Sequence, residues 1–408
     1  MIRSGSPLPA AVRRIGWSNL FAQLSEQIGL AAAPLAAVLV LSARPSETAW
    51  LQMAQTLPFL LLSIPAGLIV DRASRRLLMI GAEALRAASL AVIAALLACG
   101  GLDLPLLAAL GFAGAVGTVC YSVATPALLP ALTPRNQLAM ANRWLELARS
   151  AASMAGPALG GLLVSWLGAS AAHVLATVLS LLAIRLLSGL PRERRGPAPP
   201  RSLIHDLAEG SQFIFRHDLL RPILITAVFF NTGWFILQAI YVAYAVQNLG
   251  LSAAEVGLTL AVHGAGMIAA ALIAPALSDR ISFGTMIIIG PVSGFCAAVL
   301  MLLTAWTPSL WLACVGFFLF GAGPTLWAIA TMTLRQAVTP QAMLGRVSAF
   351  IMTATFGARP LGAAIGATVA ARSGVTACLL AATVCFGLQL TVIGLSRVPK
   401  LQQLPKPV

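Results

Sequence analysis

The chain of 408 residues is 59% hydrophobic and only 9% charged, against roughly 25% charged residues in ordinary soluble domains. A soluble fold of this length cannot cover its surface with so few charges, so the composition excludes a soluble enzyme, a disordered chain and a nucleic-acid-binding domain. A mean hydropathy of +0.90 predicts an integral membrane protein, and the formal net charge of +14 must be explained by where the basic residues lie.

Apolar stretches of about 20 residues, separated by charged or Pro/Gly-rich breaks, predict transmembrane helices. In chain order the twelve predicted spans are residues 17–41, 50–70, 77–99, 104–126, 142–166, 170–188, 222–247, 253–276, 284–305, 309–331, 345–370 and 374–396. We therefore expect an all-α membrane protein with an N-terminal six-helix bundle (1–190), a cytoplasmic linker (191–221) and a C-terminal six-helix bundle with a short tail (222–408). Residues 203–215 of the linker have near-helical apolar spacing, and they form either an interfacial helix or a solvated connection.

The distribution of arginine predicts the orientation, because cytoplasmic loops of membrane proteins are rich in Arg and Lys. With the N-terminus inside, the outer loops hold only Arg44 and Arg372, and the other loop arginines fall on the inner face. Both termini are therefore predicted to face the cytoplasm, in a bacterial-type cytoplasmic (inner) membrane. The first span is too long for the apolar core of a signal peptide, so we expect it to be retained.

The two halves repeat one another. The pair Asp71-Arg72 recurs as Asp279-Arg280 at an offset of 208 residues, and Thr133-Pro134 recurs as Thr339-Pro340 at an offset of 206. Two pseudo-symmetric six-helix halves in parallel repeat are typical of secondary transporters, whose substrate site lies between the halves near the middle of the membrane.

The segment from Gly67 to Arg76 resembles the signature loop between the second and third helices of the major facilitator superfamily. The matching residues are Gly67, Asp71, Arg72, Arg75 and Arg76, and Ser74 stands where the family usually has Gly. An Asp here accepts hydrogen bonds from a helix N-terminus or from an Arg, so the resemblance implies a gating latch on the inner face. We assign the second-half copies Asp279 and Arg280 to the same role, and the alternative is that these charges only set the topology.

The run from Gly156 to Gly161 resembles the GPxxGG motif that is associated with exporters in this superfamily. Its residues Gly156, Pro157, Gly160 and Gly161 are assigned to helix packing, since small residues let helices approach backbone to backbone and Pro bends a helix. A generic packing face is the alternative. The copy at an offset of 206, residues 362–366, keeps the small residues but lacks the Pro.

Over the whole chain the resemblance is best to the branch that includes enterobactin-type siderophore exporters and macrolide efflux proteins. Glu26, eight positions before Pro34, and the run Gly345-Arg346-Val347 carry this resemblance. Many proton-driven drug exporters have an Arg in the fourth span, whereas residues 104–126 contain no basic residue.

Ionisable residues inside a membrane span cost about 2.5–3.5 kcal/mol each on insertion scales, so each is a candidate functional residue. Glu26 lies near the middle of the first span, where apolar surroundings favour the protonated carboxyl group. We expect Glu26 to couple transport to protons. The alternative is a Glu that hydrogen-bonds another helix or binds substrate.

The substrate is expected to meet polar and aromatic groups near the same depth. Glu83 and Arg86, and likewise Glu146 and Arg149, are spaced to pair along their own helices, although Arg149 also has the reach to contact substrate or Glu26. Arg359 has no acid near it in sequence and needs a partner from another helix or an anionic substrate. The predicted substrate-binding residues are Gln23, Arg149, Asn231, Trp234, Gln238 and Arg359.

No phosphate-binding loop or catalytic motif occurs in the sequence, so neither ATP-driven transport nor an enzyme is expected. We predict a monomeric secondary exporter of a small amphipathic organic compound, driven by proton antiport and in contact with membrane lipids, without cofactor, metal site or nucleic-acid partner. The alternatives are an importer or lipid flippase of the same fold, or a membrane receptor that does not transport.

Overall fold

The computed structural model describes residues 10–133, 137–191, 203–340 and 343–405. Helices make up almost all of these ranges, and no strand occurs in them, which confirms the all-α prediction. The helices are α1 Ala10–Leu39, α2 Pro45–Arg72, α3 Arg75–Cys99, α4 Leu104–Leu132, α5 Leu138–Leu167, α6 Ala169–Ser188, α7 Leu203–Arg216, α8 Leu220–Gln247, α9 Ala253–Ser278, α10 Phe283–Leu303, α11 Leu310–Val338 and α12 Leu344–Gly394.

Nine of the helices in the described ranges are long and apolar enough to cross a membrane, namely α3 to α6 and α8 to α12. The predicted spans lie on helices with similar bounds, but several helices extend further at the predicted inner ends. α1 begins at Ala10 rather than at residue 17, and α11 continues to Val338. The added turns contain Arg13 and Arg14 in α1 and Arg335 in α11, which interrupt the apolar run that hydropathy detects.

The last helix, α12, contains 51 residues and includes two predicted spans. Gly374 interrupts it with φ 79° and ψ 178°, a left-handed conformation that favours glycine. The sequence predicts a short loop at residues 371–373, whereas these residues are helical. The chain therefore reverses at a single glycine.

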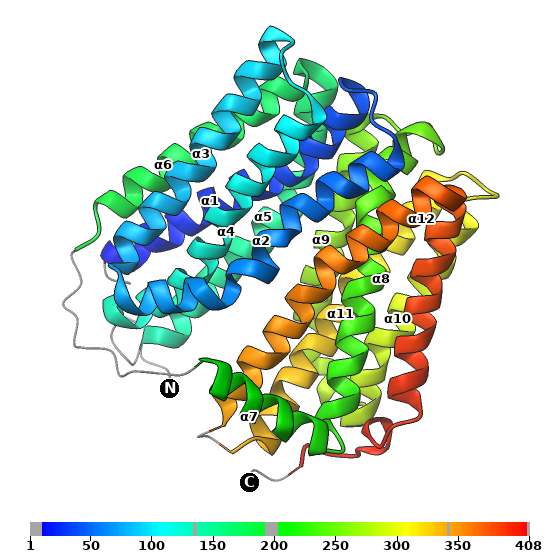
Figure 1. Cartoon of the computed structure of the whole chain (residues 1–408). Coiled ribbons are helices and arrows are strands. Elements are labelled where there is room, and N and C mark those ends of the chain that lie inside the picture. Colours follow the sequence, from blue (N-terminus) through cyan, green and yellow to red (C-terminus); the bar gives the residue numbers. More distant parts are fainter. Residues whose placement is uncertain (1–9, 134–136, 192–202, 341–342, 406–408) are drawn as a thin grey trace.

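The helices fall into two groups that lie beside each other (Figure 1). α1 to α6 form one group, α8 to α12 form the other, and α7 lies across one end of the second group. The amphipathic segment 203–215 is thus a helix, and it is held on α12. Glu209 of α7 pairs with Arg346 of α12, and the rings of Phe215 and Phe350 are 6.1 Å apart.

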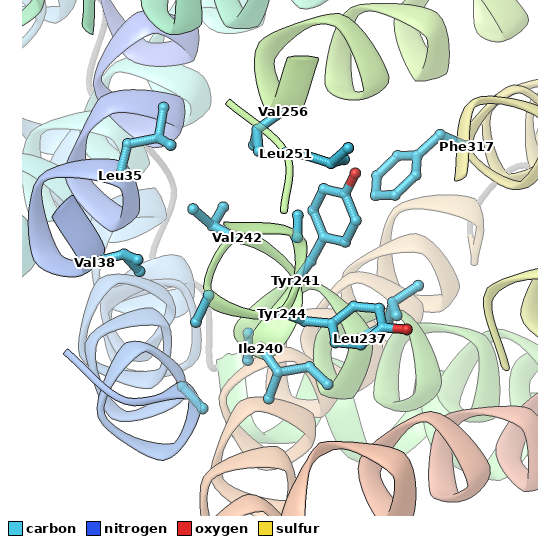
Figure 2. Packing of buried hydrophobic residues seen from close by; sticks show 14 of the residues in the cluster. Leu35, Val38, Leu237, Ile240, Tyr241, Val242, Tyr244, Leu251, Val256 and Phe317 are labelled. Carbon is cyan, nitrogen blue, oxygen red and sulfur yellow. The ribbon is translucent and has the colours of Figure 1, made fainter. Parts of the chain in front are cut away.

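The largest apolar cluster connects the two groups at the end opposite α7. Figure 2 shows Leu35 and Val38 of α1 on one side of it and Val242 of α8 facing them. The loop after α1 reaches the same region, since Gln247 Nε2 donates a hydrogen bond to the carbonyl oxygen of Ala43 over 2.9 Å. The two groups are therefore in close contact at the predicted outer end.

The turn between α2 and α3 explains why serine replaces the usual glycine. Ser74 has φ −62° and caps α3, with its side chain accepting a hydrogen bond from the backbone N–H of Leu77. Ser282, at the offset of 208 residues, caps α10 in the same way. Ser74 therefore serves as the helix cap at this position.

The other gating residues are only partly described. The side chains of Gly67, Asp71 and Arg72 lie outside the described part of the chain. Arg76 donates from Nε to the carbonyl oxygen of Leu187, over 3.1 Å, and so caps the end of α6. Asp279 and Arg280 are exposed just after α9.

Candidate functional site

A cavity of about 390 Å³ lies between the two helix groups. This volume falls within the range of small-molecule sites, roughly 300–1,000 Å³. Both groups contribute to its wall, with α1 to α6 on one side and α8, α9 and α12 on the other. Five residues selected from the sequence line it, namely Glu26, Arg149, Trp234, Gln238 and Arg359.

Two other predicted substrate residues do not line the cavity. Asn231 donates its side-chain N–H to the carbonyl oxygen of Ala227, one turn earlier in α8. Gln23 is half-buried on α1 outside the cavity wall. Helical spacing places Asn231 and Gln238 on one face, but the cavity ends before Asn231.

Glu26 lies beside Arg86, for which the sequence predicted a partner only on its own helix. Arg86 Nη2 of α3 lies 3.7 Å from Glu26 Oε2, and both residues line the cavity. The same Nη2 donates to Thr118 Oγ1 of α4 over 2.9 Å, and Nη1 donates to the carbonyl oxygen of Ala22 over 3.1 Å. An arginine beside the acid of the first helix is therefore present, but it comes from α3, and α4 supplies a hydroxyl.

Glu83 holds the other side of Arg86. Its Oε1 accepts from Arg86 Nη1 at 2.7 Å, as the i, i+3 spacing predicts, and its Oε2 accepts from Ser180 Oγ of α6 at 2.9 Å. Ser180 in turn lies 3.1 Å from Ser25 Oγ, next to Glu26 in α1. Glu83 is fully buried and Arg86 is 4% exposed, so this ion pair lies in the interior of the helix group.

Arg359 is enclosed by aromatic rings. Its guanidinium carbon lies 4.4 Å from the ring centre of Phe356 and 5.5 Å from the ring centres of Phe59 and Phe235. Such contacts stabilise a buried cation that keeps few hydrogen bonds. Arg359 Nε is buried without a hydrogen-bond partner in the described structure, and Glu26 lies within electrostatic range across the cavity.

The aromatic residues of the seventh and tenth predicted spans divide between core and cavity. Phe317, Phe320 and Tyr241 are buried in the apolar cluster, with 4.3 Å between the ring centres of Tyr241 and Phe317. Trp234 lines the cavity and stacks on His263, with ring centres 5.0 Å apart. The aromatic pocket expected from the sequence is therefore smaller, because most of these rings pack on each other.

Arg149 pairs with Glu146 along α5, as the spacing predicts, and both are exposed, by 46% and 60%. Arg149 also lines the cavity. In this arrangement Arg149 is paired with Glu146, and its exposure leaves it open to a ligand.

The small residues of α5 allow α1 to pack closely against it. A Cβ on Gly160 would lie 3.2 Å from the carbonyl oxygen of Ile28 and 3.3 Å from Cβ of Ala31. A Cβ on Gly156 would collide with Gln27. Any larger residue at these positions would push the wall that carries Glu26 away from α5.

The second-half copy of the motif makes the corresponding contacts. Cβ atoms on Gly362 and Gly366 of α12 would meet α8 at Thr232, Phe235, Ile236 and Ala239. Of these, Phe235, Ile236 and Ala239 stand 208 positions after the α1 residues that face the corresponding glycines of α5, and Thr232 is a contact of the second half alone. The repeat therefore extends from sequence to contacts.

The third glycine of the motif contacts the other helix group. A Cβ on Gly161 would lie 2.8 Å from Cα of Gly257 in α9, and a Cβ on Gly257 would lie 2.7 Å from the carbonyl oxygen of Pro157. One face of the motif thus packs within its own group, and the next face packs on the second group.

Solved structures share this arrangement of helices. A bacterial homologue of the iron transporter ferroportin in an inward-facing state matches with a TM-score of 0.72 at 15% identity, over 95% of this chain and 98% of that chain. A POT family transporter in complex with 5-aminolevulinic acid matches with a TM-score of 0.75 at 11% identity, over 95% and 96% of the two chains. At these identities the likeness shows the fold alone.

The chain is also similar in sequence to named exporters. The enterobactin exporter EntS of Citrobacter koseri (strain ATCC BAA-895 / CDC 4225-83 / SGSC4696) is 28% identical over 292 residues, and that of Escherichia coli O1:K1 / APEC is 28% identical over 291. Each match covers 70% of this chain, and the chain spans 65% of the length of these relatives. The family model described as transmembrane secretion effector, a major facilitator family, matches residues 3–406. With the helical groups, the cavity between them and the match over nearly its whole length, this chain belongs to the transmembrane secretion effector family of major facilitator transporters.

Proposed function

We propose that this chain is a secondary active exporter of a small amphipathic organic compound, such as a siderophore, and that it takes in protons in exchange. The observation that carries the proposal is the cavity between the two helix groups, whose opposite walls hold Glu26 and Arg359. A cavity with a half-buried acid, a half-buried cation and aromatic walls suits an amphipathic ligand. The similarity to enterobactin exporters supports export as the direction.

Alternating access is the proposed mode of transport. Close contact of the groups at the outer end supports an inward-facing state, since Gly161 meets Gly257 there and Gln247 reaches Ala43. In the proposed outward-facing state, α5 and α9 separate at the outer end and close at the inner end instead.

The proposed membrane topology has twelve crossings, with α12 making two of them on either side of Gly374. We keep the division into residues 1–190, 191–221 and 222–408, both termini in the cytoplasm, an inner-membrane location and a monomer. The matched glycine contacts of α5 and α12 support two pseudo-symmetric halves.

We propose roles for individual residues on this basis. Glu26 exchanges the proton, and Trp234, Gln238 and Arg359 contact the substrate from the second half. Arg149 contacts it from α5. Gln23 and Asn231 are outside the cavity wall in this state, so they would take part only if the wall rearranges.

The test uses enterobactin as the probe. Cells whose own enterobactin exporter has been deleted are given this chain, and enterobactin is measured in the medium and inside the cells. Export should restore enterobactin in the medium, whereas greater retention in the cells would identify an importer and no change would remove siderophore export.

Proton coupling is tested in everted membrane vesicles. Acidifying the vesicle interior should drive enterobactin uptake by the wild-type chain, and Glu26→Gln should remove the dependence on the pH gradient. Asp218→Asn is a suitable control, because Asp218 is an exposed partner of Arg397 outside the cavity. If Glu26→Gln responds to the gradient like wild type, Glu26 is not the coupling residue.

A further inference from the structure

Arg86 lies between two carboxylates rather than opposite one. It is 2.7 Å from Glu83 and 3.7 Å from Glu26. Glu83 has a full set of partners, because it also accepts a hydrogen bond from Ser180. Glu26 has the weaker contact and is 17% exposed. One guanidinium therefore serves a fixed acid and a looser one that faces the cavity.

The charge balance of this group is unfavourable when both acids are ionised. Glu26, Glu83 and Arg86 together carry a net charge of −1 in a setting where solvent compensates little. Arg359 across the cavity balances this charge only while it lies near Glu26, so one proton is favoured when Arg359 is away. A pair of acids that interact this closely binds protons as a unit rather than as two separate groups. A structural Glu83–Arg86 pair alone would be neutral and would need no proton.

The described helices around the two acids contribute several polar and ionisable side chains. α4 contributes Tyr121, 6.0 Å from Arg86, and Thr118, and α6 contributes Ser180. Across the cavity α12 contributes the cation Arg359. The remaining ionisable groups on the cavity wall are Arg149 of α5, His173 of α6 and His263 of α9.

We propose that Glu26 and Glu83 form one proton-binding unit around Arg86, in which a single proton neutralises the pair and Arg86 pairs with whichever carboxylate is ionised. This deepens the proposed function and rests on it for the use of that proton in transport. Nothing is formed or broken except the O–H bond of a carboxyl group.

Arg359 makes the proton affinity of this unit depend on the conformation. It belongs to the second helix group, whereas Glu26, Glu83 and Arg86 all belong to the first. When Arg359 lies near Glu26 it favours the ionised carboxylate, and when the groups move apart the proton is favoured. A rocking motion would therefore change proton affinity without any new side chain entering the site.

The test is an infrared pH titration of the purified full-length chain in detergent, which detects protonated carboxyl groups by their carbonyl stretch and needs no substrate. The signal of Glu26 is the one that disappears in Glu26→Gln. In Glu83→Gln, Glu26 becomes the only carboxylate beside Arg86, so the midpoint should fall by about one pH unit or more, a tenfold weaker proton affinity. An unchanged midpoint would overturn the proposal.

Further variants keep the result decisive. Arg359→Gln should raise the midpoint, and an unchanged midpoint there would overturn the dependence on conformation. Asp218→Asn should change nothing. If Glu83→Gln does not fold, Glu83→Asp replaces it: its shorter carboxylate leaves Arg86 nearer Glu26, so the midpoint should again fall, and no shift would count against the shared unit.

This measurement separates the two proposals. A shared proton in the titration together with gradient-independent enterobactin transport would leave the proton unit standing and remove antiport. Gradient-driven transport together with two carboxyl groups that titrate independently would support antiport and remove the shared proton unit.

Discussion

Gly161 of α5 and Gly257 of α9 meet backbone to backbone. A Cβ on Gly161 would lie 2.8 Å from Cα of Gly257, and a Cβ on Gly257 would lie 2.9 Å from Cα of Gly161. Neither side has a flexible side chain that could move away. This crossing brings the two helix groups into contact through the Gly156–Gly161 motif.

Gly161→Ala should disfavour the state in which α5 and α9 touch. The added methyl group meets backbone atoms on α9, and overpacking of this kind costs about 1–3 kcal/mol. We expect lower thermal stability in detergent and at least about tenfold slower enterobactin export, since 1.4 kcal/mol corresponds to a factor of ten. Gly81→Ala is the matched control because nothing lies within 4 Å of a Cβ there. Equal behaviour of the two variants would show that the crossing does not control the state.

Arg86→Gln should be far more destabilising than Arg149→Gln, although each arginine pairs with a Glu three residues before it. Arg86 is buried with two acids, and removing one partner of a buried ion pair costs about 3–5 kcal/mol. Arg149 is 46% exposed, where such pairs contribute about 0.3–0.5 kcal/mol. The unfolding temperatures of the two purified variants decide this, and similar losses would contradict the interior role of Arg86.

His217 should make the turn before α8 sensitive to pH. Its Nδ1 accepts hydrogen bonds from the backbone N–H groups of Leu219 and Leu220, at 3.1 and 3.4 Å, which only the neutral ring can do. Burial lowers the pKa of His217 below its ordinary value of 6.5, and the neighbouring Asp218 opposes this shift. The unfolded chain therefore takes up this proton first, and stability is lost as pH falls below 6.5 towards the folded-state pKa.

The corresponding variant is His217→Asn, whose side-chain oxygen accepts the same backbone hydrogen bonds without titrating. We expect the wild-type unfolding temperature to fall by about 2 °C more than that of the variant between about pH 7.5 and about pH 5. Parallel pH profiles would show that His217 does not contribute.

Asp71→Asn should slow export if the signature loop acts as a latch on the inner face. The amide keeps the shape of the carboxylate but loses its charge, so a hydrogen bond to an Arg or a helix N-terminus becomes weaker. Asp279→Asn tests the copy in the second half, where Asp279 is exposed. Export rates of enterobactin measure the effect of both variants. Full activity of Asp71→Asn would show that these charges only set the membrane topology.

Much of the fold could be read from the sequence because the apolar layer imposes it. A membrane span needs about 20 apolar residues, and that signal located the helices to within a few residues over their apolar parts. It could not show where helices emerge into water, as at Ala10 of α1, since polar helical turns have no hydropathy signal. Nor could it show that a single glycine, Gly374, would replace a loop.

The candidate site could be predicted only in part from the sequence. An ionisable side chain inside a membrane span costs free energy, which marked Glu26 and Arg359 as candidate functional residues, and both line the cavity. The partnership of Arg86 with Glu26 was missed, because Glu83 at i−3 already satisfied Arg86 locally and a contact between helices leaves no spacing in the sequence. The rings around Arg359 come from α2, α8 and α12, so their convergence is likewise a property of the packed helices.

The matched contacts of α1 and α8 place Glu26 and Trp234 at equivalent positions of the two repeats. If the halves descend from one duplicated unit, this pair records their specialisation: one copy carries an ionisable group and the other carries an indole. No acidic residue follows Asp279 in the chain. A protein assembled from two copies of the second half would therefore have no carboxylate at this depth, and one built from two first halves would lack the indole. The ancestor of such a unit would have had to serve both tasks poorly or only one of them.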